Sequence, residues 1–185
     1  KTDFNTYLKA DVEIISGLHA FADLHVRDIK YIANGVDNDG APIDLDEHFT
    51  FFNPKVGLSY TLGMNGLLYG SFAVANREPN RNDYLDAPDG LRPTHETLND
   101  LEAGYRVKTE KYFLNTNFYY MQYTNQLVLT GALNDVGYPI RENSGESYRA
   151  GVEINGRYML SEILQVAGNI ALSQNKTDFS YLDEN

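Results

Sequence analysis

Apolar and polar residues alternate along much of the chain. Even-numbered positions are apolar and most odd-numbered positions are polar over Leu18–Arg27, and similar alternation recurs over Leu67–Arg77, Glu146–Leu160 and Ile163–Ser173. Successive side chains of a β-strand point to opposite faces, so a period of two indicates strands in a sheet with one apolar and one polar face. The pattern predicts a strand in each of these four segments.

Further segments alternate less regularly. They bring the predicted number of strands to about eight, and they are Lys9–Ile15, Pro54–Leu62, Leu98–Val107 and Tyr112–Leu129. The last is rich in Asn and Tyr on both faces, so its register is open. No segment has the pattern of a helix.

The predicted connections alternate between short and long. The short ones are Ser16-Gly17, 63–66, 108–111 and Ser161-Glu162. The long ones, rich in Asp, Asn, Gly and Pro, are 32–48, 78–97, 130–145 and 176 onward. Short turns at one end and long loops at the other are typical of bacterial outer-membrane barrels. The strands also reach the ~9–11 residues that a tilted strand needs to cross a bilayer.

The predicted fold is therefore all-β: an antiparallel up-and-down β-barrel, or a barrel segment, of about eight strands. A soluble meander or β-sandwich also alternates apolar and polar residues and is the competing interpretation. If the segment stands alone, its two outer strands lack neighbours and its apolar face lies bare. We then expect the sheet to close on itself or to turn its apolar face inward.

Composition narrows the function classes. The chain has 14 Tyr and 9 Phe but no Trp, a bias that favours strands. It has no cysteine, which excludes disulfides and thiolate zinc sites. The net charge of −11 argues against a nucleic-acid partner. No apolar run approaches the ~18 residues of a transmembrane helix, so any membrane contact must be made by strands.

The sequence supports neither catalysis nor a cofactor. Gly57-Leu58-Ser59-Tyr60 lacks the second glycine of a nucleophile elbow. His19 and His25 share a strand face, but six residues at the usual rise separate them by ~20 Å, too far to share one metal ion. His48 and His95 stand alone in predicted loops. We expect no enzyme activity and no metal site, and no residue is assigned to ligand contact.

An acidic stretch is the strongest calcium candidate. Asp37-Asn38-Asp39-Gly40 is followed by Asp44, Asp46 and Glu47. Its glycine comes too early for an EF-hand, and His48 occupies the position of the bidentate Glu. A solvated acidic loop is the favoured interpretation.

Several arginines could face a lumen and meet an anionic ligand: Arg77, Arg92, Arg141, Arg149 and Arg157. Pairing with acidic residues of neighbouring strands, namely Asp100, Glu102 and Glu153, is the favoured role.

Several motifs resemble the barrel of TonB-dependent outer-membrane receptors. They are Phe51–Tyr60 at the start of a strand, Leu68–Ala73 leading to Asn76-Arg77-Glu78-Pro79, Pro93–Leu98 with Leu101–Tyr105, Asn117–Met121 with Tyr123–Leu127, and Asn143 with Ser147–Glu153. Each is degenerate alone, but their order and spacing are fairly specific. Together they cover about residues 18–172.

The resemblance implies a wall segment of a nutrient receptor in the bacterial outer membrane. Residues 1–185 would be part of one barrel domain, without the family's plug domain and closing C-terminal strand. The implied cargo is an iron chelate such as a siderophore, a cobalamin or a glycan, with the iron chelate favoured. The implied partners are outer-membrane lipid, the cargo, and TonB through the plug. The alternatives are a complete eight-strand outer-membrane barrel with a structural or adhesion role, and a soluble β-sandwich binding module.

Overall fold

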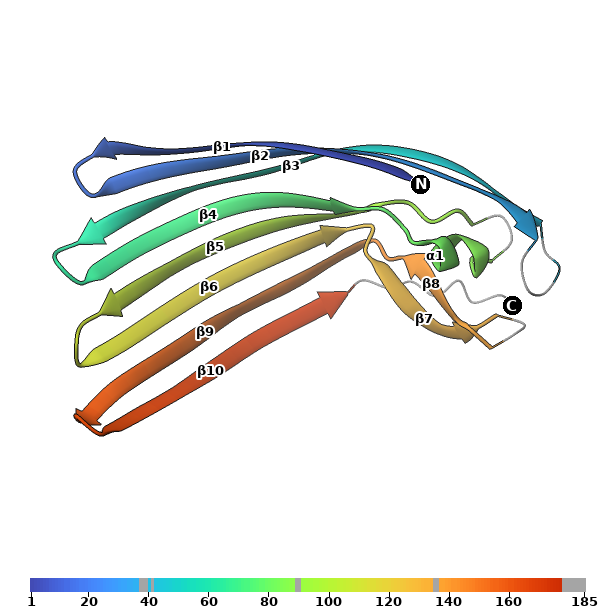
Figure 1. Cartoon of the computed structure of the whole chain (residues 1–185). Coiled ribbons are helices and arrows are strands. Elements are labelled where there is room, and N and C mark those ends of the chain that lie inside the picture. The colour runs from blue at the N-terminus through green and yellow to red at the C-terminus, as the bar shows by residue number, and fades with distance from the viewer. Residues whose placement is uncertain (37–39, 41, 89–90, 135–136, 178–185) are drawn as a thin grey trace.

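The computed structural model describes residues 1–36, 40, 42–88, 91–134 and 137–177. Within these ranges one antiparallel sheet contains eight strands in the order β1-β2-β3-β4-β5-β6-β9-β10 (Figure 1). Their bounds are β1 Thr2–Ile15, β2 Leu18–Val36, β3 Pro42–Leu62, β4 Gly66–Arg77, β5 Glu96–Lys108, β6 Tyr112–Thr124, β9 Glu146–Ser161 and β10 Leu164–Thr177. The predicted sequential antiparallel order is confirmed. The described residues include no helix long and apolar enough to cross a membrane.

Several predicted loops prove to be strands. The segment 32–48 belongs mostly to β2 and β3, which pair as far as Val36 and Pro42. The predicted loop 130–145 contains most of a second hairpin, β7 Leu127–Leu133 and β8 Pro139–Asn143. Tyr112–Leu129 is not one strand, because the extended backbone is interrupted at Asn125, whose φ is 55°. Asparagine tolerates this left-handed conformation better than most residues.

The connection after β4 contains the short helix α1, Arg81–Leu85, which the sequence pattern did not predict. Its start is a capping box: the Asn80 side chain accepts a hydrogen bond from the Asp83 backbone N–H, and the Asp83 carboxylate accepts one from that of Asn80.

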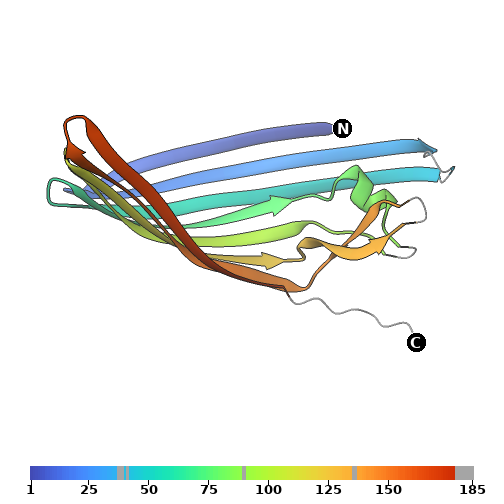
Figure 2. The ribbon, with the colours of Figure 1, turned by 90° about the horizontal axis from the view of Figure 1, so that it is seen from below.

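The two faces of the sheet differ as predicted. In every ladder the apolar positions of one strand are directly opposite the apolar positions of the next, so they gather on the same face. The apolar face carries Leu68, Phe72, Val74, Val152, Ile154, Leu164, Val166, Ile170 and Leu172. The polar face carries Arg149, Glu153, Arg157, Gln165 and Asn169. Apolar residues on the first face are widely exposed; Ile170, for example, is 61% exposed. The sheet is curved (Figure 2), and side chains of the polar face reach across intervening strands, which places that face on the concave side.

Aromatic rings lie flat on the concave face over glycines of neighbouring strands. Tyr69 is directly opposite Gly104, and its hydroxyl continues across β5 to donate to Asn117 Oδ1 at 3.0 Å. Phe21 opposite Gly57 and Tyr119 opposite Gly151 repeat the arrangement. Gly104 therefore makes room for a ring. Gly70 and Gly156 lie in unbroken ladders.

The expectation that the sheet closes or inverts is wrong. Neither β1 nor β10 has a second neighbour among the described residues, and the apolar face is convex and exposed. Rings such as Tyr69, spread across the concave surface, oppose the tighter curl that closure with so few strands requires. The curvature is that of a wider barrel.

The core lies where the concave face is covered, at the end opposite the short turns. There α1 and the β7–β8 hairpin lie against the ends of the long strands (Figures 1 and 2). The most buried apolar residues are Ile29, Ile43, Leu45, Phe51 and Leu127. Those on β2 and β3 are odd-numbered and so point to the concave side.

Candidate ligand pocket on the concave face

A pocket of about 360 Å³ opens on the concave face beside α1. Its charged lining residues are Lys1, Arg27, Arg77, Arg81, Glu47 and Glu78, and its aromatic ones are Tyr31, Phe49 and Tyr84. The long strands β2 and β3 supply one wall, the start of β1 and the end of β4 the charged rim, and α1 the other wall.

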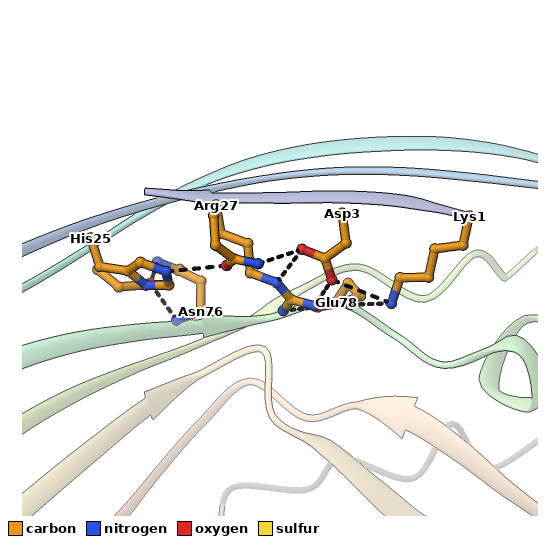
Figure 3. A network of polar contacts seen from close by, with 8 residues as sticks. Lys1, Asp3, His25, Arg27, Asn76 and Glu78 are labelled. Atoms are coloured by element: carbon orange, nitrogen blue, oxygen red, sulfur yellow. Dashed lines mark hydrogen bonds and ion pairs between the residues drawn. The ribbon is translucent and has the colours of Figure 1, made fainter. Parts of the chain in front are cut away.

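A network of ion pairs forms the charged rim (Figure 3). Arg27 Nη2 lies 2.6 Å from Asp3 Oδ2, and Arg27 Nη1 lies 3.0 Å from Glu78 Oε2. Lys1 Nζ donates to the other Glu78 oxygen at 3.1 Å. The planar guanidinium thus serves two carboxylates at once, a geometry that lysine cannot reproduce. Because β3 lies between β2 and β4, the Arg27–Glu78 pair spans a whole strand and fixes the start of the 78–95 connection.

The network continues along β1 through Asn5. Its amide donates to Asp3 Oδ1 at 3.0 Å, and its carbonyl oxygen lies 3.2 Å from His25 Nε2. Asn76, near the end of β4, donates to the carbonyl oxygen of the Asn53 side chain at 2.9 Å. These contacts fix the polar side chains of the concave face on the side of the pocket nearer the short turns.

Tyr84 is the residue of α1 that lines the pocket with an unused polar group. Within the described part of the chain, its buried hydroxyl has no hydrogen-bond partner. Burial, followed by the nearby charge of Glu47, raises the Tyr84 pKa well above its ordinary value. The phenol therefore stays protonated and can donate to an acceptor oxygen.

Two ion pairs hold the 78–95 connection, which contains α1, against β3 and β8. Arg92 Nε donates to Glu47 Oε1 of β3 at 2.8 Å, and this carboxylate raises the Arg92 pKa further above its ordinary value. The buried Asp83 of α1 lies 3.4 Å from Arg141 Nη1 of β8. Asp83 is thus a cap and an ion-pair partner at once, linking α1 to the hairpin.

Hydrogen bonds reinforce the same assembly. Asn134 donates to Asp86 Oδ1 at 2.8 Å. Asn143 accepts from the Thr94 N–H at 2.7 Å and donates to the Thr94 carbonyl at 3.0 Å. The 78–95 connection is therefore joined both to β3 and to the β7–β8 hairpin.

The predicted histidines do not converge. His19 and His25 share the concave face as expected, but they contact Asp11 and Asn5 separately. His48 is in β3 rather than a loop. His95 packs on Phe51, with ring centroids 5.4 Å apart, and so is part of the apolar packing.

The calcium candidate finds no support within the described residues. Residues 37–39 lie outside them. Asp44 and Asp46 project from β3 on the face opposite Glu47, which pairs with Arg92. Nowhere in the described ranges do three metal-ligating side chains cluster.

Three of these five arginines form ion pairs among the described residues, but the predicted partners are wrong. Arg77 pairs with Glu96, Arg92 with Glu47 and Arg141 with Asp83, rather than with Asp100, Glu102 or Glu153. Arg149 lies over the Tyr123 ring, 5.1 Å from its centroid. Arg157 faces the concave side, opposite Phe113. Of this set, Arg77 reaches the pocket.

Sequence reasoning missed Lys1, Arg27, Glu78 and Tyr84. Arg27 and Glu78 are 51 positions apart, so only the register of three strands brings them together. The Asn80–Asp83 capping box was the available signal, since it predicts a helix that carries Tyr84.

A curved sheet with an apolar convex face, a polar concave face and short turns at one end has the features of a transmembrane β-barrel wall. The sequence matches the family described as TonB dependent receptor-like, beta-barrel, over residues 2–185. The chain belongs to this family, and its place is the outer membrane of Gram-negative bacteria. Family members are transport receptors, as the prediction of a non-enzyme requires, and the soluble β-sandwich interpretation is wrong.

Solved structures share the fold. The copper transporter OprC has a TM-score of 0.79 at 13% identity, over 94% of this chain and 29% of that one. The siderophore receptor PirA from Pseudomonas aeruginosa has 0.72 at 16% identity, over 94% and 32%. The FrpB iron transporter from Neisseria meningitidis has 0.72 at 17% identity, over 98% and 27%. The chain thus spans about a third or less of these structures. No curated protein matches the sequence.

Proposed function

We propose that this chain is a wall segment of a larger receptor that imports a scarce nutrient across the outer membrane, with an iron chelate of the siderophore type as cargo. The family supports a transport receptor. The names of similar structures, which include a siderophore receptor and an iron transporter, favour the iron chelate over a cobalamin or a glycan. In this proposal residues 1–185 are part of one barrel domain, and TonB acts through a plug elsewhere in the receptor.

The pocket beside α1 is the observation that carries the cargo class. Its wall offers the Tyr84 hydroxyl, which stays protonated and has no partner among the described residues, and its rim carries the Lys1 and Arg27 cations that Asp3 and Glu78 hold in place. Donors gathered against an apolar floor suit a ligand whose surface is rich in acceptor oxygens, as in an iron chelate. With the short turns in the periplasm, the pocket faces the cell exterior.

The test is ligand binding to the full-length receptor with ferric catecholate and ferric hydroxamate chelates, cobalamin and a linear oligosaccharide. We expect binding of a ferric chelate, weakened about ten- to a hundredfold in Tyr84→Phe, since one hydrogen bond to a charged group contributes about 1.5–3 kcal/mol. Tyr138→Phe, at an exposed position, is the matched control. Preference for cobalamin or the oligosaccharide refutes the cargo class, and equal affinity of the two variants refutes the role of the pocket.

A further inference from the structure

The convex, lipid-facing surface has a hollow of about 590 Å³ over β6, β9 and β10. Gly156 and Gly168 are directly opposite each other in the β9–β10 ladder, and neither contributes a side chain. A Cβ added to Gly168 would meet nothing within 4 Å. Ile154 and Ile170 bound the hollow on the side away from the turn, and Tyr158 and Val166 bound it on the turn side.

The hollow lies in the periplasmic half of the membrane. Gly156 is five residues before Ser161, the last residue of β9, and β9 continues on the other side as far as Glu146. Tyr112 and Tyr158 are half-exposed at the turn side of the hollow and directly opposite each other. Tyrosines at this depth mark the boundary between hydrocarbon and headgroups.

A cation stands at the periplasmic mouth of the hollow. Lys111, in the β5–β6 turn, places its ammonium 5.5 Å from the centroid of the Tyr158 ring. Its backbone carbonyl accepts a hydrogen bond from Met159 N at 2.8 Å, which ties the turn to β9. Across the described ranges, no carboxylate forms an ion pair with Lys111.

We propose that this site binds a phospholipid of the periplasmic leaflet, with one acyl chain in the hollow over Gly156 and Gly168 and the phosphate on the Lys111 ammonium. Apolar residues such as Leu114, Ile154 and Ile170 line the hollow where hydrocarbon lies, and the Lys111 ammonium stands against Tyr158, at the end where the headgroup phosphates lie. A lysine at the membrane boundary favours a phosphate electrostatically, and the apolar lining favours the acyl chain.

A second hollow separates this proposal from general lipid contact. It surrounds Gly70 and Ala103 on the same convex face, has a volume of about 600 Å³ and ends at Tyr60, but among the described residues no lysine or arginine stands over the Tyr60 ring as Lys111 stands over Tyr158. Size and apolar character are therefore matched between the two hollows, and the charge at the mouth is not. We infer selective retention at the first hollow.

The experiment is native mass spectrometry of the full-length receptor in detergent, after equilibration with phosphatidylethanolamine and phosphatidylglycerol. Gly168→Leu fills the hollow with an apolar side chain that faces lipid, and Lys111→Gln removes the charge. Each should lower phospholipid occupancy at least fivefold relative to the wild type, whereas Gly70→Leu should leave it unchanged. Heat-modifiable migration on gels verifies that every variant is folded.

The outcomes decide between lipid, anion and no site. Unchanged occupancy in both Gly168→Leu and Lys111→Gln overturns the proposal, as does equal loss in Gly70→Leu. A separate arm adds inorganic phosphate without lipid: if phosphate alone displaces the retained phospholipid in a Lys111-dependent manner and Gly168→Leu has no effect, the site binds an anion rather than a lipid. Transport of the nutrient is not a readout here, so failure of this proposal leaves the proposed function untouched.

Discussion

Replacement of Gly104 by alanine should destabilise the barrel through a collision on the concave face. A Cβ at this position would lie 2.3 Å from the Tyr69 hydroxyl oxygen and 2.5 Å from the Thr116 backbone carbonyl. The hydroxyl could swing aside only by giving up its bond to Asn117. The carbonyl belongs to the adjacent strand and cannot move without disturbing the ladder.

The size of the effect follows from these two contacts. Loss of the Tyr69–Asn117 hydrogen bond costs about 1 kcal/mol. Overpacking against a fixed backbone atom costs about 1–3 kcal/mol more. The sum predicts a decrease of about 2–4 kcal/mol in the free energy of unfolding.

Urea unfolding of the full-length receptor in lipid vesicles measures this change. Gly168→Ala is the control, because its Cβ would enter open space. Measured in a Tyr69→Ala background, Gly104→Ala should cost less than in the wild type but should still cost stability, since the Thr116 carbonyl still blocks the new methyl group. Equal stability of Gly104→Ala and Gly168→Ala would refute the reasoning, and equal stability of Tyr69→Ala and the Tyr69→Ala, Gly104→Ala double variant would show that the carbonyl contact is harmless.

Two further predictions concern the convex face and the strand ends above it. Ile154→Arg should lower stability by ~2–4 kcal/mol, whereas Asn155→Arg, on the concave side, should be tolerated; heat-modifiable migration of refolded variants measures both, and equal tolerance would contradict the assignment of faces. A hydrogen bond from Thr50, and a weaker effect of one from His48, hold the pKa of Asp28 below its ordinary value. The ionised carboxylate therefore adds stability above the unfolded-state pKa of ~3.9, and this stability is lost as the pH falls through the lowered folded-state value. Acid unfolding should consequently shift to higher pH in Asp28→Asn, and an unchanged midpoint would argue against these hydrogen bonds.

The membrane-spanning part of the fold could be predicted from sequence because lipid and lumen impose opposite demands on alternate residues. Above the membrane those demands change. In β3 the apolar parity is even from Phe52 to Leu62, but it is odd from Ile43 to Phe51, where the concave face is the buried one. A prediction that assumes one apolar parity per strand ends the strand at this switch, and for that reason the sequence pattern indicates a loop over 32–48.

The candidate pocket was beyond sequence reasoning for another reason. Its ion pairs join positions whose separation is set by the lengths of several strands and turns, and an error of one residue in any register moves Arg27 away from Glu78. Glu47 illustrates the difficulty: it stands in an acidic run that suggests a cation site, yet its neighbours Asp46 and His48 point to the opposite face and Arg92 is its partner.

The contacts that join the 78–95 connection to β3 and to the β7–β8 hairpin have a consequence for how the exposed surface can diversify. A receptor surface is under pressure to change wherever phages, toxins or antibodies recognise it, and surface loops usually change independently of one another. Here Glu47 forms an ion pair with Arg92, and Asp83 forms one with Arg141. The two members of each pair belong to different segments, so loss of one charge leaves the other unpaired. Among close homologues, replacement of one member should be accompanied by replacement of its partner, so that the exterior varies in linked pairs rather than loop by loop.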